Sequence, residues 1–97
     1  MLHSFGVSSA DGEAPYAGLV DVKGALYGTT DGGGVKGDGT VFSITTSATE
    51  TVLHSFKGGK TDGENPLAGL INVKGKLYGT TGSGGVKGAG TVFSLKP

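Results

Sequence analysis

The chain has 97 residues with 8 acidic and 8 basic side chains, so its formal net charge is zero and favours neither nucleic acid nor an anionic membrane as a partner. All basic residues are lysines, so no arginine can bind a phosphate through two parallel hydrogen bonds. Cysteine is absent, which excludes disulfides and metal sites with thiolate ligands. No apolar run approaches the roughly 18 residues of a membrane span, no signal-peptide pattern is visible, and the location is left open.

The sequence consists of one unit written twice at an offset of 51 residues. The segments LHSF, AGL, LYGTT, GGVKG and GTVFS all recur at this offset without a gap, and 29 of the 46 aligned positions are identical. Internal repetition of this length is typical of repeat architectures in which each unit is one supersecondary element.

In chain order the predicted elements are strands and turns. Residues 2–5 form the first β-rich run, residues 16–44 hold three more, and further runs follow at 51–56, 67–73, 76–81 and 90–95. These runs are rich in β-branched and aromatic residues, and glycine-rich turns separate them. No window of a dozen residues combines an apolar 3.6-residue period with freedom from Gly and Pro, so no helix is predicted.

Four antiparallel strands in about 50 residues indicate an all-β fold of the β-propeller class, with two four-stranded blades per chain. A β-helix needs shorter coils, and a single sandwich does not need repeated units. The predicted division is residues 1–15 as an outer strand plus loop, 16–56 as a complete first blade, and 57–97 as a second blade that lacks its outer strand.

The opening segment MLHSF matches the outer strand of the first blade at 52–56, so it is the strand that the second blade lacks. We therefore expect it to complete the second blade of a neighbouring copy. A closed ring of such copies has an even number of blades, six in a homotrimer or eight in a homotetramer. The alternative is that the chain is a fragment of a longer one. The expected closure residues are Leu2, His3, Ser4, Phe5, Val92, Phe93, Ser94 and Leu95.

The long connections share one face of such a blade, and any ligand is expected there. The repeated Asp-Gly-Glu offers carboxylates for a cation or for sugar hydroxyls, but Asp-Gly is also ordinary turn chemistry. Asp31 and Asp38 have neutral counterparts in the second unit, which fits a site in one blade or neutral drift. The candidate binding residues are Asp11, Glu13, Tyr16, Asp31, Asp38, Asp62 and Glu64.

No pattern for catalysis, metal or cofactor binding is present. His3 and His54 are equivalent by repeat, and a structural role is favoured over metal ligation because no second His or Cys stands near. Ser4 and Ser55 adjoin them but point to the opposite side of a strand, so no serine–histidine pair is expected. We therefore expect a protein that is not an enzyme and has no cofactor.

The motifs LYGTT and GTVFS, preceded by LHSF and a Pro-x-Ala-Gly-Leu segment, resemble the GloVer tandem repeat, a Gly-rich bacterial repeat of surface-anchored or secreted proteins. The resemblance covers nearly the whole chain and implies an extracellular propeller-type scaffold without catalytic residues to carry over. The near identity of the units also fits a recently amplified or designed repeat.

Three functions compete on this sequence. The first is a self-assembling ring whose partner is the chain itself. The second is a glycan-binding module with sites between blades, although without Trp or Arg the stacking on a sugar falls to Tyr16, Tyr27 and Tyr78. Tyr27 and Tyr78 are more consistent with a core role. The third is an enzyme, which needs carboxylates converging in a pocket.

Overall fold

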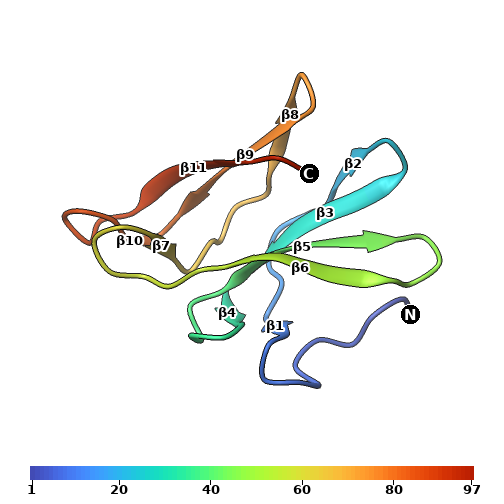
Figure 1. Cartoon of the computed structure of the whole chain (residues 1–97), viewed down its shortest axis with the longest axis horizontal. Helices are drawn as coiled ribbons and strands as arrows, with labels where there is room; N and C mark the ends of the chain where they lie inside the picture. The colour runs from blue at the N-terminus through green and yellow to red at the C-terminus, as the bar shows by residue number, and fades with distance from the viewer.

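The computed structural model describes all 97 residues, and every regular element in it is a β-strand (Figure 1). The all-β class predicted from the sequence is therefore confirmed. The strands in chain order are β1 (Gly12–Glu13), β2 (Val20–Val22), β3 (Ala25–Thr30), β4 (Gly32–Gly33), β5 (Thr40–Thr45), β6 (Glu50–Ser55), β7 (Gly63–Glu64), β8 (Ile71–Val73), β9 (Lys76–Thr81), β10 (Ser83–Gly84) and β11 (Thr91–Leu95).

The first repeat unit folds into a four-stranded antiparallel sheet in the order β2-β3-β5-β6. The tight turn between β2 and β3 is Lys23-Gly24, and both residues have positive φ (53° and 88°). A two-residue turn with positive φ at both positions matches the right-handed twist of the strands it joins. Opposite β6 the register of β5 shifts between Val41 and Phe42, which marks a β-bulge.

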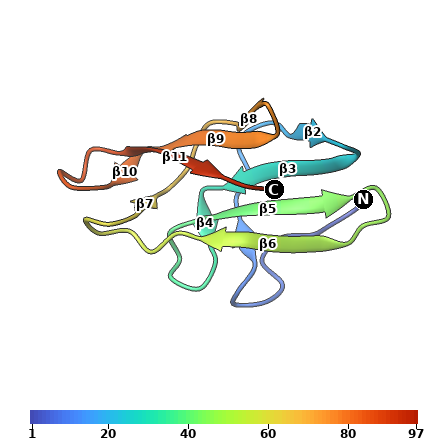
Figure 2. The ribbon, with the colours of Figure 1, turned by 45° about the horizontal axis from the view of Figure 1, so that its top comes forward.

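The second repeat unit folds into a three-stranded antiparallel sheet in the order β8-β9-β11. Its register repeats that of the first unit, since Tyr78 lies opposite Ser94 as Tyr27 lies opposite Ser43. No strand of the chain pairs with the outer edge of β11, which is the edge that β6 occupies on β5. The two sheets lie side by side and do not form a closed ring (Figures 1 and 2).

The long connections of each unit meet in a short ladder at one end of its sheet. β1 pairs with β4, and β7 pairs with β10. Gly12 and Gly63 sit at these ladders over the threonine pairs Thr30–Thr40 and Thr81–Thr91, whose hydroxyl groups are 2.7 Å apart. A Cβ at either glycine would collide with the threonine side chains. The sequence analysis placed the long loops together but missed these ladders, because a two-residue run of glycine carries no strand pattern.

The main hydrophobic core lies between the two units rather than within either of them. Its six buried residues are Val22, Tyr27 and Val41 on the first sheet, Leu70 and Leu77 on the second side of the junction, and Phe56, which follows β6 and contacts Phe93 of the second sheet. The expected core role of Tyr27 is confirmed by its burial, whereas its counterpart Tyr78 is only half-buried.

Two segments differ from the predicted strands. The run at 67–73 is a strand only over Ile71–Val73, because Ala68 turns its carbonyl toward the first unit and accepts a hydrogen bond from Thr29 Oγ1 (3.3 Å). Residues 1–5 form no strand within the chain and pair with none of its strand edges. A β-strand needs a partner edge for its backbone groups.

Candidate functional site

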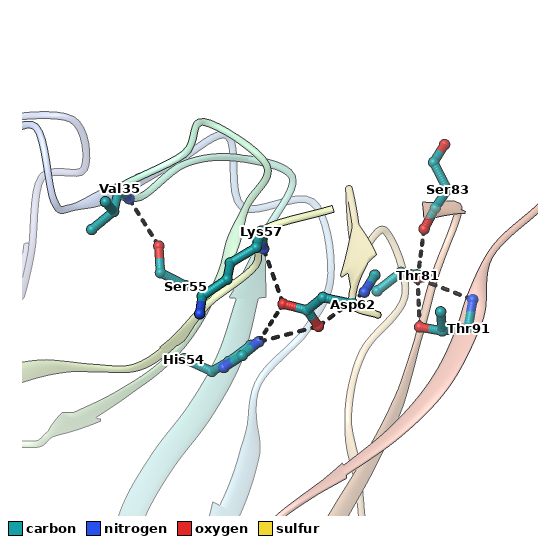
Figure 3. A network of polar contacts seen from close by, with 9 residues as sticks. Val35, His54, Ser55, Lys57, Asp62, Thr81, Ser83 and Thr91 are labelled. Carbon is teal, nitrogen blue, oxygen red and sulfur yellow. Dashed lines mark hydrogen bonds and ion pairs between the residues drawn. The ribbon is translucent and has the colours of Figure 1, made fainter. Parts of the chain in front are cut away.

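The connection that follows β6 is fixed by a carboxylate that binds both a histidine and the backbone (Figure 3). Asp62 Oδ2 accepts hydrogen bonds from His54 Nε2 (3.1 Å) and from the Lys57 backbone N–H (3.0 Å). Asp62 Oδ1 accepts a third from the Gly63 N–H (2.9 Å). We call this arrangement the histidine–aspartate clasp, and it holds the chain as it passes from one unit to the next.

The clasp also positions an aromatic side chain at the junction. The His54 ring meets Phe56 edge-on with centroids 4.7 Å apart, and Phe56 in turn meets Phe93 of the second sheet at 5.2 Å. Phe56 is 1% exposed. Edge-to-face aromatic contacts of this kind add specificity to the area that the rings bury.

The N-terminal segment makes the same clasp on the first unit. His3 Nε2 donates to Asp11 Oδ2 at 2.9 Å, and Asp11 also accepts from the backbone N–H groups of Gly6 (3.1 Å) and Gly12 (2.9 Å). His3 meets Phe5 edge-on at 4.7 Å, and Phe5 meets Phe42 at 5.0 Å. His3 and Phe5 therefore contact the first unit as His54 and Phe56 contact the second. Residues 1–5 have no strand partner, whereas β6 is paired with β5 of the first sheet.

These contacts describe what the two repeated aspartates do. Asp11 is buried and Asp62 is half-buried, and each accepts two backbone hydrogen bonds from its own loop in addition to the one from histidine. This is the turn role that the sequence analysis weighed against ligand binding, extended by the histidine. Both histidines are half-buried.

Glu50 adds a third ionisable side chain to the clasp of the first unit. Its Oε1 lies 3.9 Å from His3 Nε2, and its Oε2 is buried with no hydrogen-bond partner. Burial raises the pKa of Glu50 above its ordinary value of 4.5, the negative charge of Asp11 raises the pKa further, and His3 lowers it. The side chain of Glu50 is 12% exposed.

His3, Asp11 and Glu50 are the residues with which this chain could hold a metal ion, since their ligand atoms lie within 4.8 Å of one another. The second clasp offers only His54 and Asp62, because the position equivalent to Glu50 falls after Pro97. The sequence analysis did not single out Glu50. Glu50 has no counterpart at the 51-residue offset, and no pattern in the sequence indicates that it lies beside His3.

The other predicted ligand residues do not converge on one pocket. Glu13 and Tyr16 are exposed and Glu64 is half-buried in the β7–β10 ladder. Asp31 and Asp38 meet through their backbone carbonyls at Asn65, which donates from its amide Nδ2 to Asp31 O (3.0 Å) and from its N–H to Asp38 O (2.7 Å). Asn65 was missed by the sequence analysis, because its position reads as Ala14 in the first unit.

The predicted closure residues lie at the two ends of the molecule. Of Leu2, His3, Ser4 and Phe5, His3 binds Asp11 and Phe5 contacts Phe42 of the first unit. On the second unit Val92, Phe93, Ser94 and Leu95 lie in β11. Met1 and Val92 are among the most exposed apolar side chains, at 106% and 79%. The two sets do not contact each other in one chain.

The largest hollow of the surface lies beside β11. It measures about 520 Å³ and is lined by residues that include Asp62, Gly85, Val86, Thr91 and Val92. At the same place in the first unit stands Ser55, whose hydroxyl accepts a hydrogen bond from the Val35 N–H at 2.8 Å (Figure 3). The hollow thus corresponds to the position that the last residues of β6 occupy in the first unit.

The serine and histidine side chains of β6 have separate partners: Ser55 binds the backbone of Val35 and His54 binds Asp62. Both side chains therefore fix neighbouring loops in place, and they do not bind each other. The structure contains no helix long and apolar enough to cross a membrane.

No curated protein and no solved structure matches the chain closely enough to serve as a relative. The Gloeobacter/Verrucomicrobia repeat matches it over residues 1–97, which is its whole length. The resemblance drawn from LYGTT, GTVFS and LHSF is therefore confirmed, and the chain belongs to the Gloeobacter/Verrucomicrobia repeat family.

Proposed function

We propose that this chain is a self-assembling scaffold of the β-propeller type, in which the N-terminal segment of one copy completes the sheet of the next. The observation that carries the proposal is the duplicated clasp. Residues 1–5 make on the first unit the His–Asp and Phe–Phe contacts that residues 52–56 make on the second. The segment thus contacts the first unit as the end of β6 contacts the second, and β11 has an unpaired outer edge, which together support the proposal.

The expected pairing follows from the register of β5 and β6. Thr40 lies opposite Ser55, Val41 opposite His54, and Phe42 opposite Val52. Shifting these pairs by the 51-residue offset places Thr91 opposite Ser4, Val92 opposite His3 and Phe93 opposite Met1 of the partner copy. Addition of a strand to an open sheet edge is a common mode of association, and it covers backbone groups that otherwise invite aggregation.

The contact is head-to-tail, so it either closes into a ring or continues as a filament. We propose closure with six or eight units, which corresponds to three or four copies. The scaffold carries no catalytic role in this proposal. The glycan-binding alternative has less support, because Tyr16 is exposed but its counterpart in the second unit is Leu67, so a chain offers this stacking position at most once.

Native mass spectrometry of the purified chain tests the proposal. A single species at three or four times 9.5 kDa is expected, and a monomer at all concentrations would contradict it. Deleting residues 1–5 uncovers the side of the first unit that they contact and removes the strand that is added to the neighbouring copy. The ring is therefore expected to give way to smaller or aggregated species. If the truncated chain keeps the ring mass, the assignment of MLHSF is wrong.

A further inference from the structure

Both ends of the molecule carry an apolar sheet face that has no partner. The leading face belongs to the first unit and consists of Phe5, Leu19, Leu26 and Phe42. The trailing face belongs to the second unit and consists of Ile71, Val73, Tyr78 and Val92. Leu19, Ile71, Val73 and Val92 are 53%, 61%, 46% and 79% exposed. The leading face is hollowed into a groove of about 420 Å³, and seven of its nine lining residues are apolar.

The junction between the two units shows what each face fits. Val22, Tyr27 and Val41 are the repeat counterparts of Val73, Tyr78 and Val92, and they are 8%, 9% and 0% exposed. They pack against Phe56, Leu70 and Leu77, which are the counterparts of Phe5, Leu19 and Leu26. The trailing face of one unit and the leading face of the next are thus the two halves of one observed interface.

We infer that the partner of both faces is a second copy of this chain, seated with its trailing face on the leading face in the geometry of the junction between the two units. This inference rests on the proposed function and specifies its interface. The occupant is a copy of the chain because it supplies the same side chains that already pack in this way within one molecule.

The polar contacts of the internal junction give the contacts expected between copies. Thr29 Oγ1 donates to Ala68 O, and the Asn65 N–H donates to Asp38 O. Their counterparts run from Thr80 of the partner copy to the Ala17 carbonyl, and from the Ala14 N–H to the Ala89 carbonyl of the partner copy. Each of these hydrogen bonds has a backbone carbonyl as its acceptor. The replacement of Asp38 by Ala89 in the second unit therefore does not remove the bond.

One contact has no counterpart between copies. The Asn65 amide donates to Asp31 O at 3.0 Å, but the equivalent residue in the first unit is Ala14, which has no side-chain donor. Its expected acceptor, the carbonyl of Gly82 in the partner copy, is present. Position 14 therefore sets the strength of the copy-to-copy interface, which has one hydrogen bond fewer than the junction within the chain.

The backbone at position 14 already suits asparagine. Ala14 has φ 61° and Asn65 has φ 56°, so both lie in the left-handed region. Asparagine enters this region more readily than alanine. The substitution Ala14→Asn is therefore expected to be accepted without any change of loop conformation.

The test is assembly as a function of concentration, followed by sedimentation velocity, for the full chain and three variants. Ala14→Asn is expected to lower the midpoint concentration of assembly roughly fivefold, because a hydrogen bond contributes about 1 kcal/mol net. Ala14→Gly relieves the steric strain of the positive φ at position 14 without adding a hydrogen-bond donor. Ala14→Asp has the shape of asparagine but no amide donor. Neither is expected to tighten assembly.

The outcomes separate the inference from the proposed function. A gain with Ala14→Asn alone supports both. If the full chain assembles but Ala14→Asn assembles no better than Ala14→Gly, the interface differs from the internal junction and the inference is overturned, while the proposed function stands. If neither the full chain nor Ala14→Asn assembles, the proposed function fails and the inference fails with it.

Discussion

Val41 and Val92 hold the same position in two nearly identical units, yet Val41 is 0% exposed and Val92 is 79% exposed. Both lie in the third strand of their unit, on β5 and on β11. The difference arises from the neighbourhood alone, since Val41 is covered by the next unit and Val92 has no next unit in the chain. The exposed valine lies on the surface against which we propose that another copy packs.

Replacing Val92 by lysine is expected to weaken assembly by roughly tenfold or more. The interface would lose the burial of a valine side chain, about 1.5 kcal/mol, and would gain a charge that must be removed from water. The isolated chain should keep its thermal stability, because Val92 is exposed there. Light scattering over a concentration series measures the first effect and circular dichroism the second.

The matched control is Val35→Lys, which places the same charge on an equally exposed valine (69%) in the loop between β4 and β5. This variant is expected to assemble like the unchanged chain. Equal loss of assembly in both variants would show that added charge rather than the trailing face is responsible.

Joining two copies tests the strand addition directly. Residues 47–51 (SATET) comprise the end of the turn after β5 and the first two residues of β6, and the same five residues placed between Pro97 and Met1 of a second copy restore the 51-residue spacing. The linked segment MLHSF is expected to pair with the preceding β11. Hydrogen exchange should then show protection of the backbone amides in 91–95 of the first copy at dilutions at which the unlinked chain is a monomer.

The linked chain also reports the number of units in the ring. It holds four units, so an eight-unit ring closes from two linked chains, whereas a six-unit ring does not close from a whole number of them. A single species with the mass of two linked chains in native mass spectrometry indicates a ring of eight units. Exchange at 91–95 as fast as in the unlinked monomer would contradict the proposed strand addition whatever the mass.

Replacing Glu50 by glutamine is expected to stabilise the fold at neutral pH. Because burial and Asp11 raise the pKa of Glu50, the folded chain retains its proton where the unfolded chain releases it. The contribution of Glu50 to stability is therefore fully present below its ordinary pKa of 4.5 and is lost as the pH rises through the raised value. Glutamine removes this loss.

Thermal unfolding between pH 4 and pH 8 checks this prediction. The difference in melting temperature between Glu50→Gln and the unchanged chain should be largest at neutral pH and should vanish toward pH 4. Glu13→Gln is the control, since Glu13 is exposed, and it should show no such trend. A destabilised Glu50→Gln at neutral pH would mean that the ionised carboxylate is held favourably beside His3.

The repeat made most of the architecture predictable. An offset of 51 residues, glycine-rich turns and β-rich runs determine the all-β class, the four-strand order of the first unit and the tight turn at Lys23-Gly24. These features are local, since each strand and turn depends on residues next to it in the sequence. The turn role of Asp11 and Asp62 could be predicted too, because it depends on the adjacent Asp-Gly sequence.

Contacts between segments far apart in the chain were decided only by the tertiary structure. Glu50 reaches His3 within the first unit, and Asn65 reaches Asp31 and Asp38 across the junction between the units. No spacing in the sequence indicates either contact. The burial of a side chain depends likewise on which surface faces it. Identical residues therefore become core at Val41 and open surface at Val92, because a sequence repeat specifies a unit, whereas its neighbours determine which of its faces are covered.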